Sequence, residues 1–356
     1  MADKIKVLVV GVGNMGRSHA LAYHRMDGFE LVGLVSPSIH SRANLPAEIQ
    51  DYPKFADFDE AMAATKPDAV SINSYTDTHK EYALKAFDAN CHVFMEKPLA
   101  LTVDDAQEIV DAAKAKNRKL VVGYILRVHP AWQQFIAETK KLGKPLVMRM
   151  NLNQQSKGPT WAIHRTMMAD HTPLVDCGVH YIDVMCQMTE AKPVRVHGIG
   201  ASLTDKVPVQ NYGHMHIEFD DGSVGWYEAG WGPMMSEVAY FVKDVVGPKG
   251  HVSIVPKQGA EAASSDDVDA HTNTNALLVH SAELDENDNF VHEDQWLSMA
   301  DEPGHDELCQ REQELFLKAI VEDMDLSDLM QSAVNTFRLT MAADQSIREG
   351  RAINIE

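Results

Sequence analysis

The start of the chain joins a short apolar strand pattern to a glycine-rich turn and then to a helical pattern. The run KIKVLVV leads directly into GVGNMG at residues 11–16, and GRSHALAYHRM follows with apolar residues near helical spacing. Glycine-rich turns are frequent by themselves, but a GxGxxG that leaves a strand and opens a helix is fairly specific. The free backbone amides of such a helix N-terminus can bind an anion. The sequence therefore predicts a strand–turn–helix unit that binds a dinucleotide.

The same alternation continues to about residue 125. Strand patterns occur at FELVGLVS, AVSINS, HVFME and KLVVGYI, separated by helical patterns at DFDEAMAAT, THKEYALKAFDAN and VDDAQEIVDAAKAK. Strand and helix in repetition indicate parallel strands with helices on both faces of the sheet. We therefore expect an α/β fold in which residues 1–125 form a doubly wound parallel sheet.

After residue 145 several strand patterns follow one another and alternate polar with apolar residues. They are PLVMRMNLNQ, VRVHGIGASL, NYGHMHIEF, SVGWYEAGW and VAYFVKDVVG, and the turn Asp220-Asp221-Gly222 predicts a hairpin between two of them. One helix, TPLVDCGVHYIDVMCQM, interrupts the series, and ELCQREQELFLKAIVED and SDLMQSAVNTFRLTMAADQSIREG close the chain. This pattern predicts a second domain over residues 126–356 that is built on a largely antiparallel sheet.

Two parts of the second domain carry expectations of their own. The acidic and polar segment 258–290 predicts long solvated loops with one weak strand at ALLVH. The last helix, at about residues 332–350, is a candidate to pack back on the first domain.

Composition narrows the classes of partner. Among 356 residues, 32 Lys and Arg stand against 52 Asp and Glu, and the net charge of -20 repels nucleic acid and anionic membranes. The N-terminal apolar run is too short for a signal peptide, and no apolar stretch is long enough to span a bilayer, which predicts a cytoplasmic protein. The 17 histidines show no HExxH pattern and the four cysteines no CxxC spacing, so we expect neither a metal site nor disulfides.

Each glycine of the GVGNMG turn has a separate physical role. Gly11 permits the tight turn, Gly13 lets the backbone approach a pyrophosphate, and Gly16 lets the helix pack closely on the strand. Asn14 and Met15 supply amides of the first helical turn. These five residues are candidate cofactor contacts, and they favour NAD or NADP as the cofactor.

The end of the second predicted strand bears on the choice between these two cofactors. A carboxylate about 20 residues past the glycines usually binds the ribose of NAD, but this stretch reads LVSPS. The hydroxyls of Ser36 and Ser38, with His40 and Arg42 nearby, can accept a ribose phosphate without repulsion. We therefore expect a slight preference for NADP; the alternative is a loosely held adenosine end that admits both cofactors. Three further candidate cofactor contacts follow the strand AVSINS: Ser74, Tyr75 and His79.

The stretch HVFMEKPLA ends an apolar strand on an adjacent acid and base, Glu96 and Lys97. The simplest interpretation is a solvated turn, with Pro98 and then Thr102 as N-cap introducing the next helix. However, ligands of a doubly wound sheet bind beyond the carboxyl ends of its strands. In that interpretation Lys97 faces the nicotinamide of a bound cofactor.

The helix pattern VDCGVHYIDVM carries three polar residues at helical spacing. Asp176 and His180 are four residues apart, and Asp183 follows three residues later, so all three share one face of a continuous helix. A buried structural network is one interpretation of this face. Catalysis is the other, and the dinucleotide turn and Lys97 in the same chain favour it.

Four segments together resemble one known family. They are GVGNMGRSHA, HVFMEKPLA, GYILRVHPAW and DCGVHYIDVM, and in this order they resemble the glucose–fructose oxidoreductase and inositol dehydrogenase family, Gfo/Idh/MocA, over nearly the whole chain. The resemblance implies a Rossmann domain, a C-terminal α/β domain with an open sheet, and an active site between them. It also implies that Lys97, Asp176 and His180 are catalytic and that the Lys97–Pro98 bond is a candidate for the cis form. Homodimers or homotetramers formed through the sheet are common in the family, and the strands through Trp226, Tyr227 and Trp231 would supply an apolar partner face.

Oxidation of a secondary alcohol assigns roles to this set. His180 is the best base, because an imidazole accepts a proton near neutral pH and Asp176 can orient it. Lys97 can donate to the forming carbonyl oxygen. Glu96 either pairs with Lys97 or the nicotinamide ribose, or is only a turn residue.

Candidate substrate contacts suit a sugar, cyclitol or related polyol. Arg127 follows the strand KLVVGYI, and the predicted loop QQSKGPTWAIHR carries an aromatic face and hydrogen-bonding groups. Each has packing or a surface position as its alternative. The candidates are Lys97, Arg127, Trp161, His164, Asp176, His180 and Asp183; Arg165 is a weaker candidate, and His214, His216 and Tyr240 are unplaced.

Two readings compete for the function. The first is an NAD(P)-dependent dehydrogenase or reductase that acts on CH–OH groups, including a member that oxidises a glycoside or a non-sugar alcohol. The second is a non-catalytic sensor or regulatory protein that binds NAD(P). The three catalytic candidates, Lys97, Asp176 and His180, favour the enzyme.

Overall fold

The computed structural model describes residues 4–41, 45–236, 242–255, 272–299 and 301–355. The chain divides into two compact units: residues 1–125 with 304–335 form unit 1, and residues 126–303 with 336–356 form unit 2. This division differs from the predicted domains, because residues 304–335 belong with the first unit and not with the second. Within the described residues, no helix combines the length and apolar character needed to cross a membrane.

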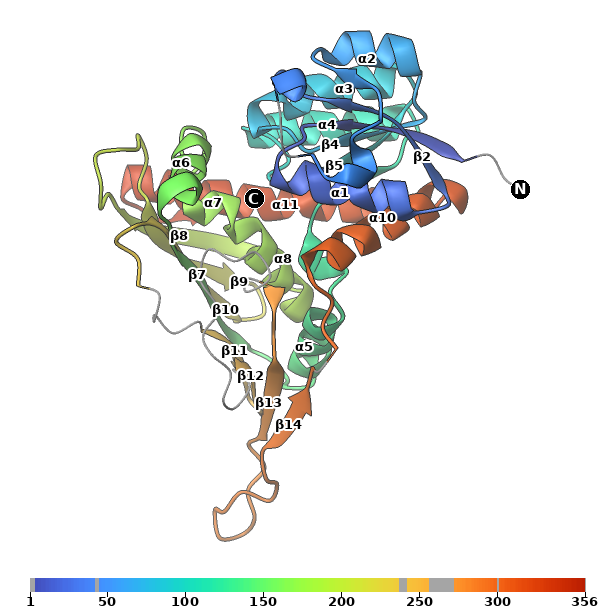
Figure 1. The fold of residues 1–356 in the computed structure, drawn as a ribbon. Coiled ribbons are helices and arrows are strands. Elements are labelled where there is room, and N and C mark those ends of the chain that lie inside the picture. The colour runs from blue at the N-terminus through green and yellow to red at the C-terminus, as the bar shows by residue number, and fades with distance from the viewer. Residues whose placement is uncertain (1–3, 42–44, 237–241, 256–271, 300, 356) are drawn as a thin grey trace. The chain divides into compact units, whose positions relative to one another are not determined.

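Unit 1 is built on a six-stranded parallel sheet in the order β3-β2-β1-β4-β5-β6 (Figure 1). This is the strand order of a doubly wound dinucleotide-binding fold, and it confirms the predicted α/β class. The strands β1, β4 and β5 are almost entirely buried, as helices on both faces require. The strands are β1 Ile5–Val10, β2 Phe29–Val35, β3 Lys54–Phe55, β4 Ala69–Ile72, β5 His92–Met95 and β6 Leu120–Val122.

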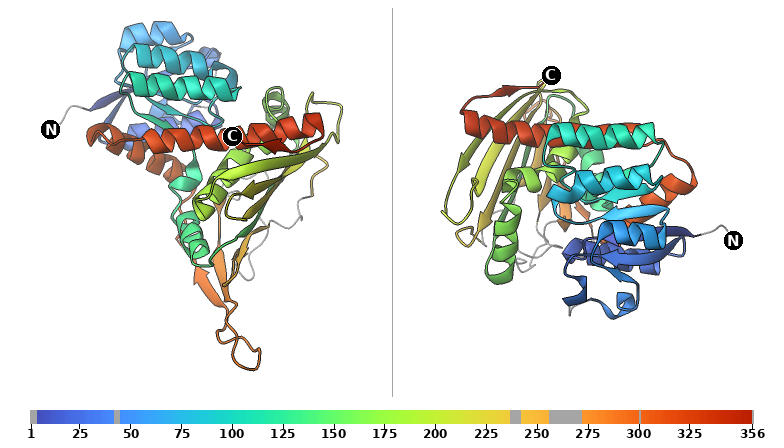
Figure 2. Two further views of the ribbon diagram at one scale, coloured as in Figure 1. Left: turned by 180° about the vertical axis from the view of Figure 1, so that it is seen from behind. Right: turned by 90° about the horizontal axis from the view of Figure 1, so that it is seen from above.

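The four helices predicted in this unit are present, and they can be followed from blue to teal in Figures 1 and 2. Helices α2, α3 and α4 lie on one face of the sheet, and α1 lies on the other together with α10 (Figure 1). Thr102 caps α4 through a hydrogen bond from the backbone amide of Asp105, as predicted. The helices are α1 Asn14–Arg25, α2 Phe58–Thr65, α3 His79–Asp88 and α4 Val103–Ala115.

The two predicted C-terminal helices are α10 His305–Val321 and α11 Ser327–Glu349. Helix α10 packs against α1, where the hydroxyl of Tyr23 lies 2.5 Å from the side-chain oxygen of Gln313. The Phe316 ring stacks on Phe29 at 6.1 Å. Packing on α1 explains why the chain returns to unit 1 after residue 303, whereas the residues of α11 from 336 onward belong to unit 2.

Unit 2 is built on a nine-stranded sheet in the order β14-β13-β12-β11-β7-β10-β9-β8-β15. All neighbours are antiparallel except β7 and β10, which confirms the largely antiparallel prediction. The β9–β10 hairpin turns at Asp220-Asp221-Gly222 as predicted, with Gly222 at φ +81°. The strands are β7 Val147–Gln155, β8 Pro193–Ala201, β9 Tyr212–Phe219, β10 Val224–Gly232, β11 Lys243–Gly247, β12 Gly250–Val255, β13 Ala276–Ser281, β14 Gln295–Ser298 and β15 Ile353–Asn354.

Several local expectations for unit 2 need correction. Strand β13 covers the predicted weak strand ALLVH, but β12, β14 and β15 have no counterpart in the prediction, and residues 258–271 of the acidic segment lie outside the described residues. The predicted loop QQSKGPTWAIHR is wrong from Gly158 onward, because α6 Gly158–Met167 begins there with a proline in its first turn. The predicted single helix is two, α7 Pro173–Asp176 and α8 Gly178–Thr189, and α5 Pro130–Lys140 is an addition.

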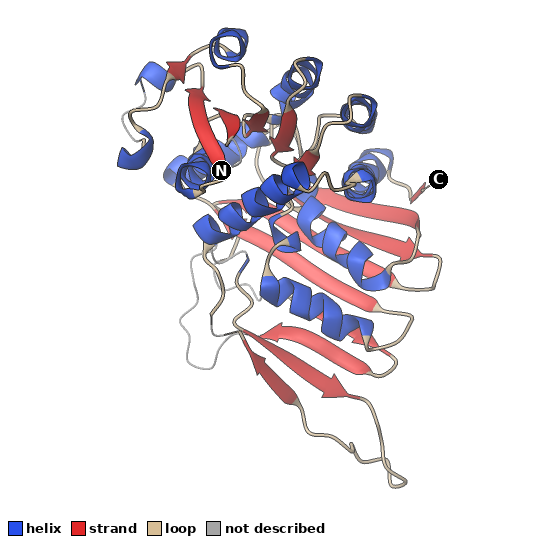
Figure 3. Cartoon of the chain, turned by 90° about the vertical axis from the view of Figure 1, so that its right-hand side faces the viewer, coloured by secondary structure: helices blue, strands red, loops and turns tan. Residues whose placement is uncertain are grey.

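One face of the sheet in unit 2 carries helices, among them α5 and α8 (Figure 3). Because successive residues of a strand point to opposite faces, Tyr227 and Trp231 share the helix-covered face and are fully buried there, while Trp226 lies on the other. The cross-strand neighbours on the Trp226 face include His216 and His197. The predicted apolar partner face is therefore wrong in two of its three aromatic residues, which are buried inside the unit; the open face mixes polar side chains with exposed valines, namely Val147, Val224 and Val246. Association through this face stays a prediction.

Candidate active site

The GVGNMG turn connects β1 to α1 in the form that phosphate binding requires. Gly11 has φ +81°, and a Cβ there would lie 2.5 Å from backbone atoms of Asn73. A Cβ on Gly16 would lie 1.7 Å from the carbonyl oxygen of Gly11, so both positions depend on glycine. A Cβ on Gly13 would meet nothing within 4 Å, and Gly13 is the N-cap of α1. The open side of Gly13 and the helix amides behind it fit a pyrophosphate.

The residues after β2 lie where an adenosine ribose is expected. Ser36 is buried and Ser38 exposed, and their hydroxyl oxygens are 3.4 Å apart. His40 is exposed in the same short segment, and Arg42 lies outside the described residues. These hydroxyls can donate to a ribose or to a ribose phosphate, so the geometry admits both cofactors.

The residues after β4 divide between an open position and a structural one. Tyr75 is 58% exposed, and the Ser74 hydroxyl is hydrogen-bonded to Thr78 at 2.6 Å. His79 is buried, and its two ring nitrogens face the carbonyl oxygens of Ser74 and Pro98 at 3.1 and 3.0 Å. Burial lowers the pKa of His79, and the two backbone hydrogen bonds act against this shift. The imidazole therefore braces the turn at Pro98, and direct contact of His79 with a cofactor stays a prediction.

The Glu96-Lys97-Pro98 turn follows the last residue of β5, and the Lys97–Pro98 peptide bond is cis, as the resemblance implied. Lys97 is half-buried, whereas Glu96 is 6% exposed. The Glu96 carboxylate accepts a hydrogen bond from the Lys97 backbone amide at 3.2 Å and lies 2.8 Å from Nε2 of His19. Glu96 is thus part of a buried network and is not a solvated turn residue. His19 was not identified from the sequence, although it lies one helical turn after Gly16.

Asp176 and His180 lie on either side of the junction between α7 and α8. The backbone at Cys177 keeps helical dihedral angles of φ −83° and ψ −33°, and the amide of His180 donates to the Cys177 carbonyl at 3.2 Å. Asp176 is buried and His180 half-buried. Burial first, and the charge of Asp176 among smaller causes, raise the pKa of Tyr227 well above its usual value. A carboxylate and an imidazole one turn apart can orient and support a general base.

Arg127 and Asp183, two predicted substrate contacts, bind each other in unit 2. Nε of Arg127 lies 2.8 Å from one carboxylate oxygen of Asp183, and Nη2 lies 2.5 Å from the other. Gln187 and Thr336 also donate to this carboxylate, at 2.9 and 3.4 Å. The pair is largely buried and bidentate, which is the strong form of this interaction. It provides a structural role for both residues, and their contact with substrate stays a prediction.

Trp161 and His164 are buried on α6. The His164 ring stacks on Trp231 with centroids 4.3 Å apart, and the Trp231 indole donates to Gln154 at 2.5 Å. Arg165 lies over the Trp161 ring at 5.9 Å. The aromatic groups are therefore already packed in this unit. Gln154 was missed from the sequence because it occupies the inward face of β7, where the preceding residues Met148, Met150 and Leu152 are apolar.

Lys243 is a third residue, after His19 and Gln154, that was not identified from the sequence. It begins β11, is 5% exposed, and its ammonium lies 6.0 Å from the Trp132 ring centroid and 5.7 Å from that of Tyr181. Burial lowers the pKa of Lys243 to about 8. Its position two residues before the buried Val245, on the inward side of the strand, is the signal that could have identified it.

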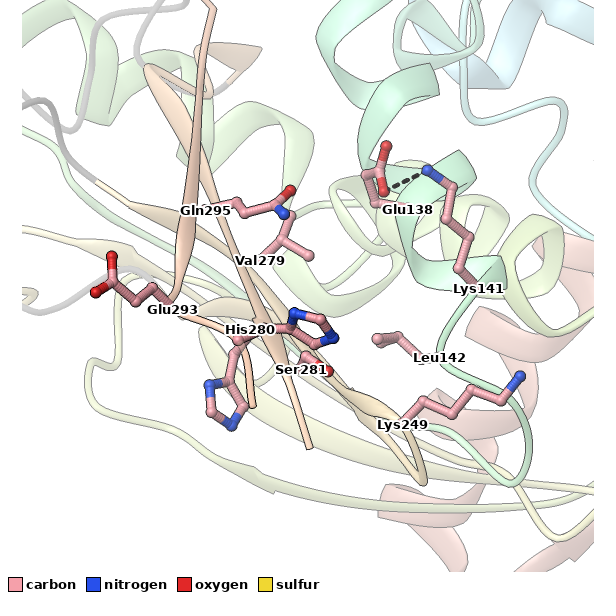
Figure 4. A pocket seen from close by; sticks show the side chains of 10 residues that line it. Glu138, Lys141, Leu142, Lys249, Val279, His280, Ser281, Glu293 and Gln295 are labelled. Carbon is pink, nitrogen blue, oxygen red and sulfur yellow. Dashed lines mark hydrogen bonds and ion pairs between the residues drawn. The ribbon is translucent and has the colours of Figure 1, made fainter. Parts of the chain in front are cut away.

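The structure also contains a surface pocket and a group of possible metal ligands. Figure 4 shows a surface pocket of unit 2 that lies beside the end of α5 and strand β13; Lys141 at its rim is paired with Glu138 at 2.6 Å, and none of the predicted site residues lines it.

In the described part of the chain, one group of three possible metal ligands occurs, formed by His19, Cys309 and Glu312 within 4.8 Å. Both ring nitrogens of His19 already face other side chains, and burial raises the pKa of Cys309 and of Glu312, so protons are retained there.

A doubly wound parallel sheet with a phosphate turn, together with a second unit built on a largely antiparallel sheet, defines a class of nicotinamide-dependent oxidoreductases. Residues 5–124 match the oxidoreductase family with an NAD-binding Rossmann fold, and residues 133–252 match the GFO/IDH/MocA C-terminal domain. The chain therefore belongs to the Gfo/Idh/MocA oxidoreductase family, as the sequence motifs suggested, and its first unit is an NAD-binding Rossmann domain.

Three relatives illustrate the range of this similarity. UDP-N-acetylglucosamine 3-dehydrogenase of Acidithiobacillus ferrooxidans is 31% identical over 199 residues, which cover 56% of this chain and 59% of the relative. D-glucoside 3-dehydrogenase of Escherichia coli is 24% identical over 274 residues, which cover 72% of this chain and 78% of that one. The crystal structure of scyllo-inositol dehydrogenase from Lactobacillus casei with bound NAD(H) and scyllo-inositol superimposes with a TM-score of 0.73 at 18% identity, covering 99% of both chains. The last similarity concerns the fold.

Proposed function

We propose that this protein is an NAD(P)-dependent dehydrogenase that oxidises a secondary hydroxyl of a sugar, cyclitol or related polyol. The observation that carries the proposal is that the phosphate turn and Lys97 both follow strands of one parallel sheet. The turn joins β1 to α1, and Lys97 lies at the carboxyl end of β5. Family membership supports the reaction class, and the sugar and inositol dehydrogenases among the relatives support the substrate class.

The reaction assigns a role to each candidate side chain. A bound nicotinamide supplies the acceptor for the hydride that leaves the carbinol carbon. His180 takes the hydroxyl proton, and Asp176 stabilises the imidazolium that results. Lys97 donates a hydrogen bond to the oxygen as it becomes a carbonyl oxygen, where a fixed positive charge lowers the barrier. Proton and hydride thus leave the alcohol separately, and the product is a ketone.

The cofactor choice within this proposal depends on Ser36 and Ser38. The expected slight preference for NADP has no support from the comparisons, since the family is described as NAD-binding and the Lactobacillus casei structure holds NAD(H). The preference can be measured from the dissociation constants of NAD and NADP. A clearly smaller constant for NAD would reverse it.

The roles of Lys97 and His180 are tested by substitution. We expect Lys97→Ala and His180→Ala each to lower turnover by about 100-fold or more, with the cofactor dissociation constant unchanged within about twofold. Matched controls are Lys116→Ala and His292→Ala, which remove exposed side chains of the same two types. Turnover close to that of the unmodified protein in either test variant would remove that residue from the mechanism.

The non-catalytic sensor is the competing proposal, and one assay separates the two. The absorbance of reduced nicotinamide is followed over a panel of polyols, inositols and sugars with either cofactor. Turnover on any of them supports the dehydrogenase. Cofactor binding without turnover on the whole panel supports the sensor.

A further inference from the structure

A chain of buried polar side chains in unit 1 connects helix α10 to Glu96. The Tyr23 hydroxyl lies 2.5 Å from Oε1 of Gln313, and Nε2 of Gln313 lies 2.9 Å from Nδ1 of His19. Nε2 of His19 lies 2.8 Å from Oε1 of Glu96. His19 and Gln313 have no exposed surface, and Tyr23 is 1% exposed. None of these three side chains was assigned a role above.

The donors in this chain all point the same way. Burial raises the pKa of Tyr23, so its hydroxyl stays protonated and donates a hydrogen bond to the Gln313 oxygen. The Gln313 amide group then donates to Nδ1 of His19, so Nδ1 acts as the acceptor and Nε2 carries the ring proton. Nε2 donates to the Glu96 carboxylate. A reversed amide would place the ring proton on Nδ1 and set a lone pair of His19 against the carboxylate, which is repulsive. The arrangement therefore selects one tautomer of His19.

The hydrogen-bonded series of side chains ends at the backbone amide of Lys97. The second carboxylate oxygen of Glu96 accepts the Lys97 amide at 3.2 Å. Gly123, directly after β6, leaves room for this carboxylate, because a Cβ there would lie 3.3 Å from it. Glu96 is thus fixed between the His19 ring and the Lys97 amide, and its orientation depends on a helix that follows it by more than 200 residues.

A second buried carboxyl group, that of Glu312, lies close to this network. Glu312, on α10, is 2% exposed, and in the described part of the chain its carboxyl oxygens have no hydrogen-bond partner. Burial, and then the charge of Glu96, raise the pKa of Glu312 well above its usual value. Hydrogen bonds to a carboxylate favour its charged form. Glu96 faces two donors, whereas the Glu312 oxygens have none among the described residues, so the charge is favoured on Glu96.

We propose that Tyr23, Gln313 and His19 are positioning residues that hold Glu96 in one orientation and thereby place Lys97 for the reaction. This inference rests on the proposed function for its kinetic consequence, but its structural part does not. The three side chains support Glu96 and are not themselves catalytic. Helix α10 therefore affects turnover through this hydrogen-bonded chain.

The tautomer of His19 is the first test and needs no substrate. Nitrogen NMR of the ¹⁵N-labelled full chain is expected to show the His19 ring protonated on Nε2 and not on Nδ1. Gln313→Leu removes the donor to Nδ1, and we expect it to change the His19 nitrogen shifts while the shifts of the exposed His292 stay the same. A ring protonated on Nδ1 in the unmodified protein would overturn the inference, whatever its activity.

The kinetic test separates positioning from packing. We expect His19→Phe to lower kcat about 10-fold or more and to leave the cofactor dissociation constant within about twofold, because misplacement of a reacting group costs rate. His19→Gln should restore most of kcat, since its amide can donate to Glu96 as Nε2 does. Gln313→Leu should lie between the two. A folded His19→Phe or Gln313→Leu variant with the kcat and pH profile of the unmodified protein would contradict the proposal.

The two proposals can fail separately. If the unmodified protein turns over no substrate in the panel, the dehydrogenase is wrong, while the NMR result still decides whether the chain of donors exists. If turnover is present and Lys97→Ala abolishes it but the His19 variants do not change it, only the positioning role is wrong.

Discussion

The two sheets use polar side chains in different ways. In unit 1 the strands β1, β4 and β5 are mostly apolar and buried, and the polar candidates come after the strands end, as at Ser36, Ser74 and Lys97. In unit 2 polar side chains lie within the strands, as Asn151 and Gln154 do in β7. A sheet with helices on both faces leaves few places for a polar side chain inside a strand, and the buried Ser71 in β4 is an exception, whereas a sheet with one open face tolerates more of them. Chemistry in the first unit is therefore concentrated at one edge, while in the second it is distributed.

This difference predicts that unit 2 depends on buried polar pairs for its stability. Arg127→Met should have the largest effect, because it leaves the buried carboxylate of Asp183 without its bidentate partner; we expect a loss of about 3–5 kcal/mol in the free energy of unfolding. Urea denaturation monitored by circular dichroism measures it. The double variant Arg127→Met, Asp183→Leu should recover part of the loss, since it removes the unpaired charge. A single variant as stable as the unmodified protein would show that the pair is not structural.

The stability of unit 1 should depend instead on the glycines of the turn that follows β1, where an added Cβ atom meets the backbone. A methyl group at residue 16 would overlap the carbonyl oxygen of Gly11, so Gly16→Ala should lower the free energy of unfolding by about 1–3 kcal/mol. Gly13→Ala is the matched control, because nothing lies within 4 Å of the added carbon. It should leave stability unchanged and raise the cofactor dissociation constant about 10-fold, which corresponds to ~1.4 kcal/mol. Titration calorimetry and thermal denaturation separate the two effects, and equal cofactor affinity in Gly13→Ala would place the pyrophosphate elsewhere.

The smallest expected effect concerns the buried ammonium of Lys243. Its pKa is lowered by burial from 10.5 to about 8, so below pH 8 the folded protein bears the cost of a buried charge. Between pH 8 and 10.5 the folded state releases this proton while the unfolded state keeps it, and stability rises with pH. Lys243→Met should therefore stabilise the protein at pH 7 by about 1–2 kcal/mol after the loss of its ring contacts, with the gain disappearing towards pH 10.5. Urea midpoints of both proteins at pH 7 and 10 test this, and a destabilised variant at pH 7 would show that the ammonium is well compensated.

Much of the first unit could be predicted because its signals are local. The β-branched runs, the helical spacing between them and the glycines at 11, 13 and 16 each act within one element. The second unit was predicted less well for a physical reason. Strands β12 and β14 mix polar with apolar side chains, and their pairing partners, rather than their own patterns, stabilise them. The α6 segment resembled a loop because it begins with Gly158 and Pro159, although a proline also suits the first turn of a helix.

The sequence by itself determined the family, the parallel sheet with its phosphate turn, and the catalytic candidates Lys97, Asp176 and His180, because motifs at strand ends and on helices follow from local spacing. Only the tertiary structure decided which charges neutralise each other. It pairs Arg127 with Asp183 and links Glu96 to Gln313 through His19, and it buries Tyr227 and Trp231 on the side of the sheet away from Trp226. These contacts join residues tens to hundreds of positions apart, and strand register and helix packing set them, which no local pattern encodes.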